Sequence, residues 1–203
     1  MFAMKRRFRK QAAKCTMEDA EVVETEVITE GPKRFVREKV RMPDDTEIDW
    51  YYIDTPDSVM IVPITADGDV VLIRQYRHNL KTHTLELPAG TVMRGESPKD
   101  AALRELWEET GFELDPQSSL VDLGNYFVLP SETNRNAHLF LAPLVLAATT
   151  EPPGDTQIEK YFDMSVCSLP LTEALAGIGE DIHGIETAAA LLMAAHAMKE
   201  NPS

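Results

Sequence analysis

In the stretch GTVMRGESPKDAALRELWEETGF, residues 90–112, a glycine-containing turn leads into a strongly acidic segment with the features of a helix. Ser97 is a favourable N-cap, Pro98 suits the first helical position, and Gly111 suits a helix end. Five acids lie in the stretch, and three of them are close together: Glu105, Glu108 and Glu109. Like charges three or four residues apart on a helix repel by about 0.2–0.5 kcal/mol per pair. We therefore expect a group outside the helix to offset this repulsion.

The three glutamates share one face of the predicted helix. At about 100° per residue they fall within a sector of roughly 100°, and the apolar residues Leu103, Leu106 and Trp107 occupy the far arc. A hard divalent cation such as Mg²⁺, which prefers carboxylate oxygens, would offset the repulsion. The alternative is a solvated acidic helix face, which is common in acidic proteins.

Three further groups lie close to these acids in the sequence. The turn Pro88-Ala89-Gly90 can aim a backbone carbonyl at the same cation. Arg104 is a planar donor that stays charged, so it can orient a carboxylate through two hydrogen bonds. Glu96 either pairs with Arg104 or joins the metal cluster.

The spacing of the stretch carries a resemblance to a known family. It reads Gly90, five residues, Glu96, seven residues, Arg104-Glu105-Leu106, one residue, Glu108-Glu109, one residue, Gly111-Phe112. Every specified position of the Nudix box is present, so the segment resembles the signature of the Nudix hydrolases.

The resemblance implies a fold, a reaction and a set of site residues. The fold is the α/β/α sandwich of that family, and the reaction is Mg²⁺- or Mn²⁺-dependent hydrolysis of a nucleoside diphosphate linked to another moiety. By position, the implied metal ligands are Glu105, Glu108 and Glu109, assisted by the Ala89 carbonyl. Arg104 would hold the acids in place, and Glu96 would brace the loop.

Segments outside the box are similar to the ADP-ribose pyrophosphatase and nucleoside diphosphate sugar branch of the family. They are Arg74-Gln75-Tyr76-Arg77, residues 85–90, residues 126–130, residues 138–142 and residues 184–189. In that branch an arginine of the first segment commonly reaches the diphosphate, which points to Arg77 ahead of Arg74. The alternative for both arginines is strand-end solvation or a structural ion pair. The branch also implies a homodimer built by the N-terminal strands.

One loop departs from the pattern of that branch. Relatives usually carry a glutamate shortly before the strand that starts near His138, and that glutamate often serves as the base. Here Arg135 stands at the expected place, and Glu132 lies three residues earlier. Glu132 is therefore one candidate for the base, the alternative being a surface loop residue, and Glu105 is the other candidate.

Composition narrows the setting of the protein. The 203 residues carry a formal net charge of −14, from 20 basic and 34 acidic residues. This charge argues against a general nucleic-acid-binding surface. The two cysteines form neither a disulfide framework nor a zinc pattern, which favours a cytoplasmic location. No apolar run approaches the roughly 20 residues that span a bilayer, so we expect no membrane partner.

The chain is expected to contain a tail and two structured parts. Residues 1–20 form a basic tail that we expect to be disordered, with a transit peptide or an anionic-surface anchor as alternatives. Residues 21–56 read as antiparallel strands suited to dimerisation, and residues 57–203 as the Nudix domain. The overall class is α+β, with a mixed sheet flanked by helices and a small N-terminal antiparallel sheet.

Several element boundaries can be predicted within the second part. Asp67-Gly68 suggests a hairpin between strands 58–65 and 70–76. Further strands are expected over residues 138–147 and 158–164, and helices over residues 171–177 and 185–199.

The working hypothesis is a metal-dependent pyrophosphatase acting on ADP-ribose or a related nucleoside diphosphate sugar. One alternative keeps the reaction and changes the substrate to GDP-mannose, a dinucleoside polyphosphate or NADH. The other is a module that keeps the fold and senses a ligand without turnover.

Overall fold

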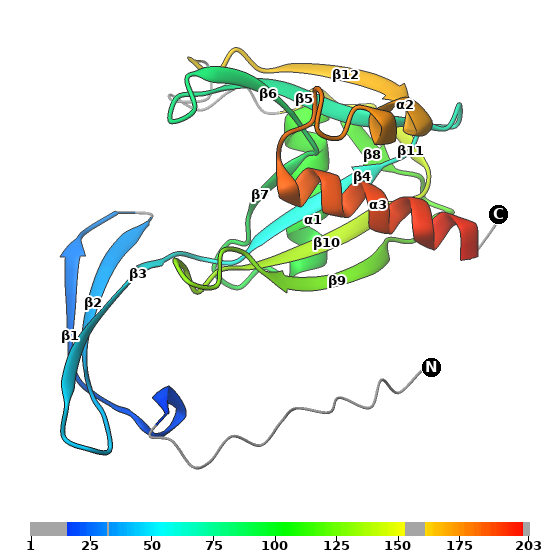
Figure 1. Ribbon diagram of the computed structural model, residues 1–203. Helices are drawn as coiled ribbons and strands as arrows, with labels where there is room; N and C mark the ends of the chain where they lie inside the picture. Colours follow the sequence, from blue (N-terminus) through cyan, green and yellow to red (C-terminus); the bar gives the residue numbers. More distant parts are fainter. Residues whose placement is uncertain (1–15, 32, 153–160, 201–203) are drawn as a thin grey trace. The chain divides into compact units, whose positions relative to one another are not determined.

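The structure is a computed structural model that describes residues 16–31, 33–152 and 161–200 (Figure 1). The chain divides into two compact units. The first unit comprises residues 1–55 and 131–134, and the second comprises residues 56–130 and 135–203. Most of the predicted basic tail, residues 1–15, lies outside the described residues. A short 3₁₀ turn, Met17–Asp19, precedes the first strand.

The first unit is a three-stranded antiparallel sheet in the order β1-β2-β3. Its strands are β1 (Glu21–Thr29), β2 (Arg34–Arg41) and β3 (Glu47–Asp54). The loop segment 131–134 joins this unit through backbone and side-chain contacts. The N–H of Ile53 donates to the carbonyl of Glu132 at 2.8 Å, and the amide of Asn134 donates to Asp54 at 2.7 Å. The small N-terminal antiparallel sheet predicted from the sequence is thus confirmed.

The second unit contains three sheets, and a mixed one lies at its centre. The order of the central sheet is β7-β4-β10-β9, in which β4 and β10 run parallel. Its strands are β4 (Ser58–Pro63), β7 (Ala89–Thr91), β9 (Val121–Phe127) and β10 (Asn136–Ala142). The second sheet has the order β12-β5-β6, formed by β5 (Asp69–Arg77), β6 (Thr82–Glu86) and β12 (Ser165–Pro170). A two-stranded sheet pairs β8 (Phe112–Leu114) with β11 (Val145–Ala147).

Helices cover both faces of the central sheet because its strands are apolar on both sides. Val59, Ile61 and Phe140 face helix α1 (Pro98–Thr110) and pack with it in one buried cluster. Alternate residues of the same strands, including Met60 and Leu139, pack in the other cluster with helix α3. Helix α2 (Leu171–Ala176) precedes α3 (Ile185–Glu200). This arrangement confirms a mixed sheet between helices.

Three details of the sequence prediction need correction. The turn at residues 65–69 forms, with the N–H of Thr65 donating to the carbonyl of Asp69 at 2.9 Å. However, β4 and β5 then separate into different sheets, because β10 and β7 pair with β4 while β12 and β6 pair with β5. The predicted strand 138–147 is interrupted at Pro143, which has no N–H to donate to a ladder.

The last correction concerns the strand predicted over residues 158–164. Residues 158–160 lie outside the described part of the chain, residues 161–164 are not extended into a strand, and β12 begins at Ser165. In the described ranges, none of the helices has the length and apolar character needed to cross a membrane.

Candidate active site

Helix α1 fixes the position of the acidic residues. Ser97 caps its first turn by accepting a hydrogen bond from the N–H of Asp100 at 3.2 Å, and Pro98 opens the helix. Gly111 closes it with a φ of 70°, a left-handed conformation that favours glycine. The buried residues Ala102 and Leu106 anchor the helix against the sheet. This packing holds the glutamates of the helix beside β7.

Arg104 lies at the centre of the acidic cluster. Its Nε donates to Glu96 at 2.9 Å, and its Nη1 donates to both Glu105 at 2.7 Å and Glu108 at 2.9 Å. Its Nη2 donates to the carbonyl of Thr91 at 3.0 Å and again to Glu96 at 3.0 Å. One guanidinium thus joins the helix acids to the loop that follows β7. These contacts raise the pKa of Arg104, chiefly through the hydrogen bonds with Glu96.

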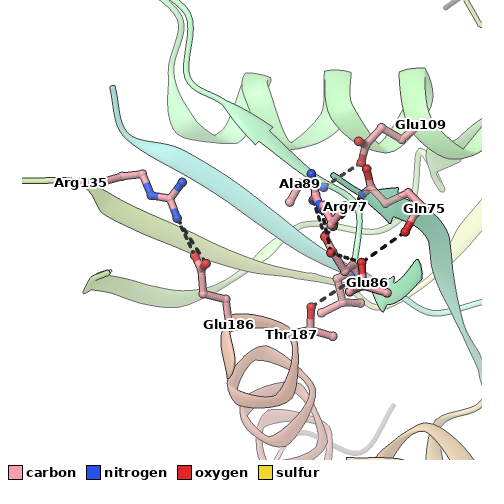
Figure 2. Close-up of polar contacts among 10 residues, drawn as sticks. Gln75, Arg77, Glu86, Ala89, Glu109, Arg135, Glu186 and Thr187 are labelled. Carbon is pink, nitrogen blue, oxygen red and sulfur yellow. Dashed lines mark hydrogen bonds and ion pairs between the residues drawn. The ribbon is translucent and has the colours of Figure 1, made fainter. Parts of the chain in front are cut away.

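Two of the glutamates rest directly on the backbone of β7. The carboxylate of Glu105 occupies the space that a Cβ at Gly90 would fill, so a side chain at residue 90 would overlap it. The carboxylate of Glu109 accepts a hydrogen bond from the N–H of Ala89 at 2.9 Å (Figure 2). The turn and the helix of the box are therefore in contact, and the acids point toward the turn.

The cluster contains more carboxylates than nearby arginines. Arg104 pairs with Glu96, Glu105 and Glu108, while Glu109 accepts the Ala89 N–H and interacts with the charge of Arg77. Burial raises the pKa of Glu109 to about 8, the charge of Glu105 adds to this effect, and the Ala89 N–H opposes it. Burial also raises the pKa of Glu105, although Arg104 opposes that shift. The ionised forms of Glu105 and Glu109 are therefore disfavoured, and an added cation would stabilise them.

A divalent cation fits this donor set. Among the residues that the structure describes, no three acid, histidine or cysteine side chains form a ready-made cage for a metal. The reason is visible in the contacts, because Arg104 and the Ala89 N–H hold the glutamates. The oxygens are nevertheless the hard donors that Mg²⁺ prefers. The glycine at residue 90 leaves room for a carboxylate against the backbone. A cation bound there would stabilise the negative charge of the glutamates.

A second charged cluster lies on the β5–β6 hairpin. Arg77 donates through Nε to Glu86 at 2.9 Å and through Nη2 to its other oxygen (Figure 2). Thr84 donates to Glu86 at 2.5 Å, and Gln75 donates weakly at 3.4 Å. Burial alone would raise the pKa of Glu86, but the hydrogen bonds from Arg77 and Thr84 outweigh it and lower that pKa.

Glu86 is a residue of this site that was not predicted from the sequence. A signal for it exists, because alternate residues of an antiparallel hairpin share a face. The register pairs Ile73 with Glu86 and Gln75 with Thr84, which places Arg77 and Glu86 on the same side. Recognising the hairpin turn at residues 78–81 would therefore have predicted the pair.

The remaining predicted residues are Arg74 and Glu132. Arg74 is exposed and, by strand alternation, points to the face of β5 opposite that of Arg77. Glu132 is exposed and belongs to the first unit, where its carbonyl binds β3. The structure therefore brings Ala89, Glu96, Arg104, Glu105, Glu108 and Glu109 together in one cluster. Arg77 stands close enough for the charge of Glu109 to raise its pKa, after the larger effect of Glu86.

Arg135, which occupies the place of an expected acid, pairs with helix α3. Its Nη2 lies 3.3 and 3.4 Å from the two carboxylate oxygens of Glu186 (Figure 2). The next residue, Thr187, is buried, and its hydroxyl accepts a weak hydrogen bond from the N–H of Leu87 at 3.4 Å. The contact of Glu186 was not predicted from the sequence, because its partner Arg135 is distant in the chain and no local pattern indicates that the two residues meet.

Known proteins share this fold and these segments. A model of the NUDIX domain family matches residues 54–182, more than half of the chain. The methanol dehydrogenase activator of Bacillus methanolicus is 31% identical over 165 residues, which cover 80% of this chain and 84% of that protein. The ADP-ribose pyrophosphatase of Mycobacterium tuberculosis is 29% identical over 184 residues, which cover 89% of this chain and 84% of that protein.

A solved structure agrees with the same assignment at the level of the fold. The crystal structure of an ADP compounds hydrolase is similar with a TM-score of 0.75 and 21% identity, covering 93% of this chain and 99% of that one. The match to the NUDIX domain model confirms the family that the sequence predicted. The chain belongs to the Nudix hydrolase family.

Proposed function

We propose that this protein hydrolyses the diphosphate bond of ADP-ribose, or of a related nucleoside diphosphate sugar. The products would be a nucleoside monophosphate and a sugar phosphate. The observation that carries the proposal is the position of the glutamates, two of which rest on the β7 backbone in a cluster with excess negative charge. The similarity to an ADP-ribose pyrophosphatase supports the choice of substrate.

Nudix hydrolases generally use divalent metal ions, and we propose Mg²⁺ for this chain, with Mn²⁺ as the alternative. Glu105, Glu108, Glu109 and the Ala89 carbonyl would hold it, with Glu96 as a further donor. When bound, the ion neutralises phosphate oxygens and makes a bound water more acidic.

Side chains of the protein would orient the carboxylates, bind the diphosphate and accept a proton. Arg104 orients the carboxylates by the hydrogen bonds described above. Arg77, fixed by Glu86, would bind the diphosphate, and Arg74 is the second candidate for that contact. A carboxylate takes the proton of the attacking water, and the two candidates are Glu105 and Glu132.

The test is a substrate panel assayed with Mg²⁺ and with EDTA. ADP-ribose, ADP-glucose, GDP-mannose, a diadenosine polyphosphate and NADH are supplied in turn, and both products are quantified by chromatography. We expect the highest kcat/KM for ADP-ribose or another nucleoside diphosphate sugar, and no turnover in EDTA. Full activity in EDTA, or a clear preference for a dinucleoside polyphosphate, contradicts the proposal.

A second candidate function follows from one relative. The protein from Bacillus methanolicus is named as an activator of a dehydrogenase, which favours a role in which the Nudix fold senses a ligand or acts on a partner. Tight binding of ADP-ribose without release of products in the same panel would support this candidate over the hydrolase.

We further propose that the first unit builds a homodimer. A three-stranded sheet buries little surface by itself, and several of its large apolar side chains are exposed. They include Val22, Ile28, Phe35, Trp50 and Tyr51. Light scattering on the purified protein should give twice the mass of one chain, and a Trp50→Glu variant should shift it toward the monomer. A monomeric wild-type protein contradicts the proposal.

A further inference from the structure

The pair formed by Arg135 and Glu186 has no place in the mechanism above. It links the start of β10 to the first turn of α3, and both side chains are partly exposed, at 26% and 34%. We propose that this pair binds sugar hydroxyls of the substrate and thereby sets which sugar the site accepts. The inference rests on the proposed function, because it assigns a part of the same substrate.

The geometry of the pair differs from that of Arg77 and Glu86. Arg77 uses two nitrogens, and its contacts with Glu86 are short. Arg135 directs one nitrogen at both oxygens of Glu186, at 3.3 and 3.4 Å. Long contacts from a single nitrogen are weaker than a two-point pair. The Arg135–Glu186 contact itself is therefore easier to break than the Arg77–Glu86 contact when a ligand inserts between the two side chains.

The pair is also fixed relative to the acidic cluster. The buried Thr187 accepts the N–H of Leu87, and Leu87 lies two residues before Ala89, whose N–H binds Glu109. The charge of Glu186 reaches Arg77, where it adds to the larger effects of Glu86 and Glu109 in raising the pKa. Figure 2 shows the Arg135–Glu186 pair and the Arg77–Glu86 pair in the same close-up of the polar network.

The chemistry of the pair suits a neutral polyhydroxyl group. Its formal charge is zero, and it offers guanidinium donors beside carboxylate acceptors, which match the hydroxyls of a sugar. A phosphate would be attracted by Arg135 but repelled by Glu186. In a nucleoside diphosphate sugar, the parts that are neutral and rich in hydroxyls are the distal sugar and the ribose of the nucleoside.

The experiment uses three non-hydrolysable competitors of the full-length protein with Mg²⁺. These are α,β-methylene ADP-ribose, which carries both sugars, α,β-methylene ADP, which carries only the nucleoside ribose, and methylenediphosphonate, which carries neither. Inhibition constants are measured for wild type, Arg135→Met and Glu186→Gln. We expect each variant to raise the constant of α,β-methylene ADP-ribose by about 10- to 100-fold and to leave that of methylenediphosphonate unchanged.

The middle competitor identifies which sugar is bound. An unchanged constant for α,β-methylene ADP assigns the pair to the distal sugar, and a raised one assigns it to the nucleoside ribose. Equal losses for all three competitors, or no loss for any, overturn the proposal. Wild-type turnover of ADP-ribose is measured in parallel, so a failure here is distinguishable from a failure of the proposed function.

A charge-swapped variant separates binding from a purely structural link. Arg135→Glu combined with Glu186→Arg keeps an ion pair between the same two positions, so the Tm should stay within a few degrees of wild type. The swapped variant should no longer bind α,β-methylene ADP-ribose more tightly than methylenediphosphonate to the extent that wild type does, because donor and acceptor have exchanged places. A swapped variant that retains the wild-type gain shows that the pair only joins β10 to α3, and overturns the proposal.

Discussion

The two charged clusters of the second unit are built from the same residue types and behave in opposite ways. On the β5–β6 hairpin, one guanidinium balances one carboxylate, and the pKa of Glu86 is lowered even though the group is partly buried. At helix α1, the guanidinium of Arg104 pairs with three carboxylates, and burial raises the pKa of the neighbouring Glu109 to about 8. Burial raises the pKa in both places, but at Glu86 the hydrogen bonds from Arg77 and Thr84 outweigh it, whereas at Glu109 the hydrogen bond from Ala89 does not.

This comparison indicates which cluster is complete without a ligand. The hairpin cluster satisfies its charges internally and can serve as a preformed contact surface. In the helix cluster, burial disfavours the ionised glutamates, and an added cation would stabilise them. Substitutions that change the charge ratio of either cluster should therefore have unequal effects.

The largest effect is expected from Glu109→Gln. Loss of this carboxylate should lower kcat by about 10³-fold, because the cation would lose a ligand. The thermal unfolding midpoint measured without metal should stay the same or increase. Glu86→Gln in the balanced cluster should lower kcat/KM by only about 10-fold. Steady-state assays with Mg²⁺ measure both, and Glu113→Gln, at an exposed position on β8, serves as the control.

Equal losses in Glu109→Gln and Glu86→Gln would contradict this reading of the two clusters. Such a result would mean that the excess charge on helix α1 has no special role in the reaction.

A smaller effect is expected in the pH dependence of stability without metal. Since the folded pKa of Glu109 lies above its ordinary value of 4.5, the folded state holds a proton that the unfolded state releases. The free energy of unfolding should therefore fall between pH 4.5 and about 8, by at most about 1.4 kcal/mol per pH unit. Urea unfolding in EDTA measures this slope.

The same titration in Glu109→Gln supplies the control. Its slope should be much flatter over this pH range, because the substituted amide does not titrate. Identical slopes in the two proteins would show that other groups cause the pH dependence.

The smallest effect is expected from Thr84→Val. The variant removes one hydrogen bond from Glu86 but keeps its pairing with Arg77, so the free energy of unfolding should fall by about 1 kcal/mol. Chemical denaturation measures the change, with Thr82→Val at an exposed position of the same strand as the control. A loss of several kcal/mol would mean that the hairpin cluster depends on the hydroxyl more than on the ion pair.

The acidic cluster could be predicted from the sequence because its geometry is local. Ser97 and Gly111 define the helix, and helical spacing then places Glu105, Glu108 and Glu109 on one face. The contact of Arg104 with Glu96 also follows from a short separation along the chain. In these cases local rules and the final structure agree.

The missed features depend on contacts between distant segments. The Asp67-Gly68 turn is correct locally, yet β4 and β5 separate because each finds partners far along the chain. Glu186 lies 51 positions from Arg135, so no periodic pattern connects them. Segment 131–134 associates with β3 through the carbonyl of Glu132, a contact that residue type does not encode.

The bare backbone at Gly90 has a consequence for how this protein can vary during evolution. The carboxylate of Glu105 fits against residue 90 only because the loop and the first turns of α1 have one particular length. Exposed residues between them, such as Met93 and Lys99, are free to change identity. A single inserted or deleted residue in the first turns of α1 would rotate Glu105 about the helix axis and move its carboxylate away from the backbone of Gly90.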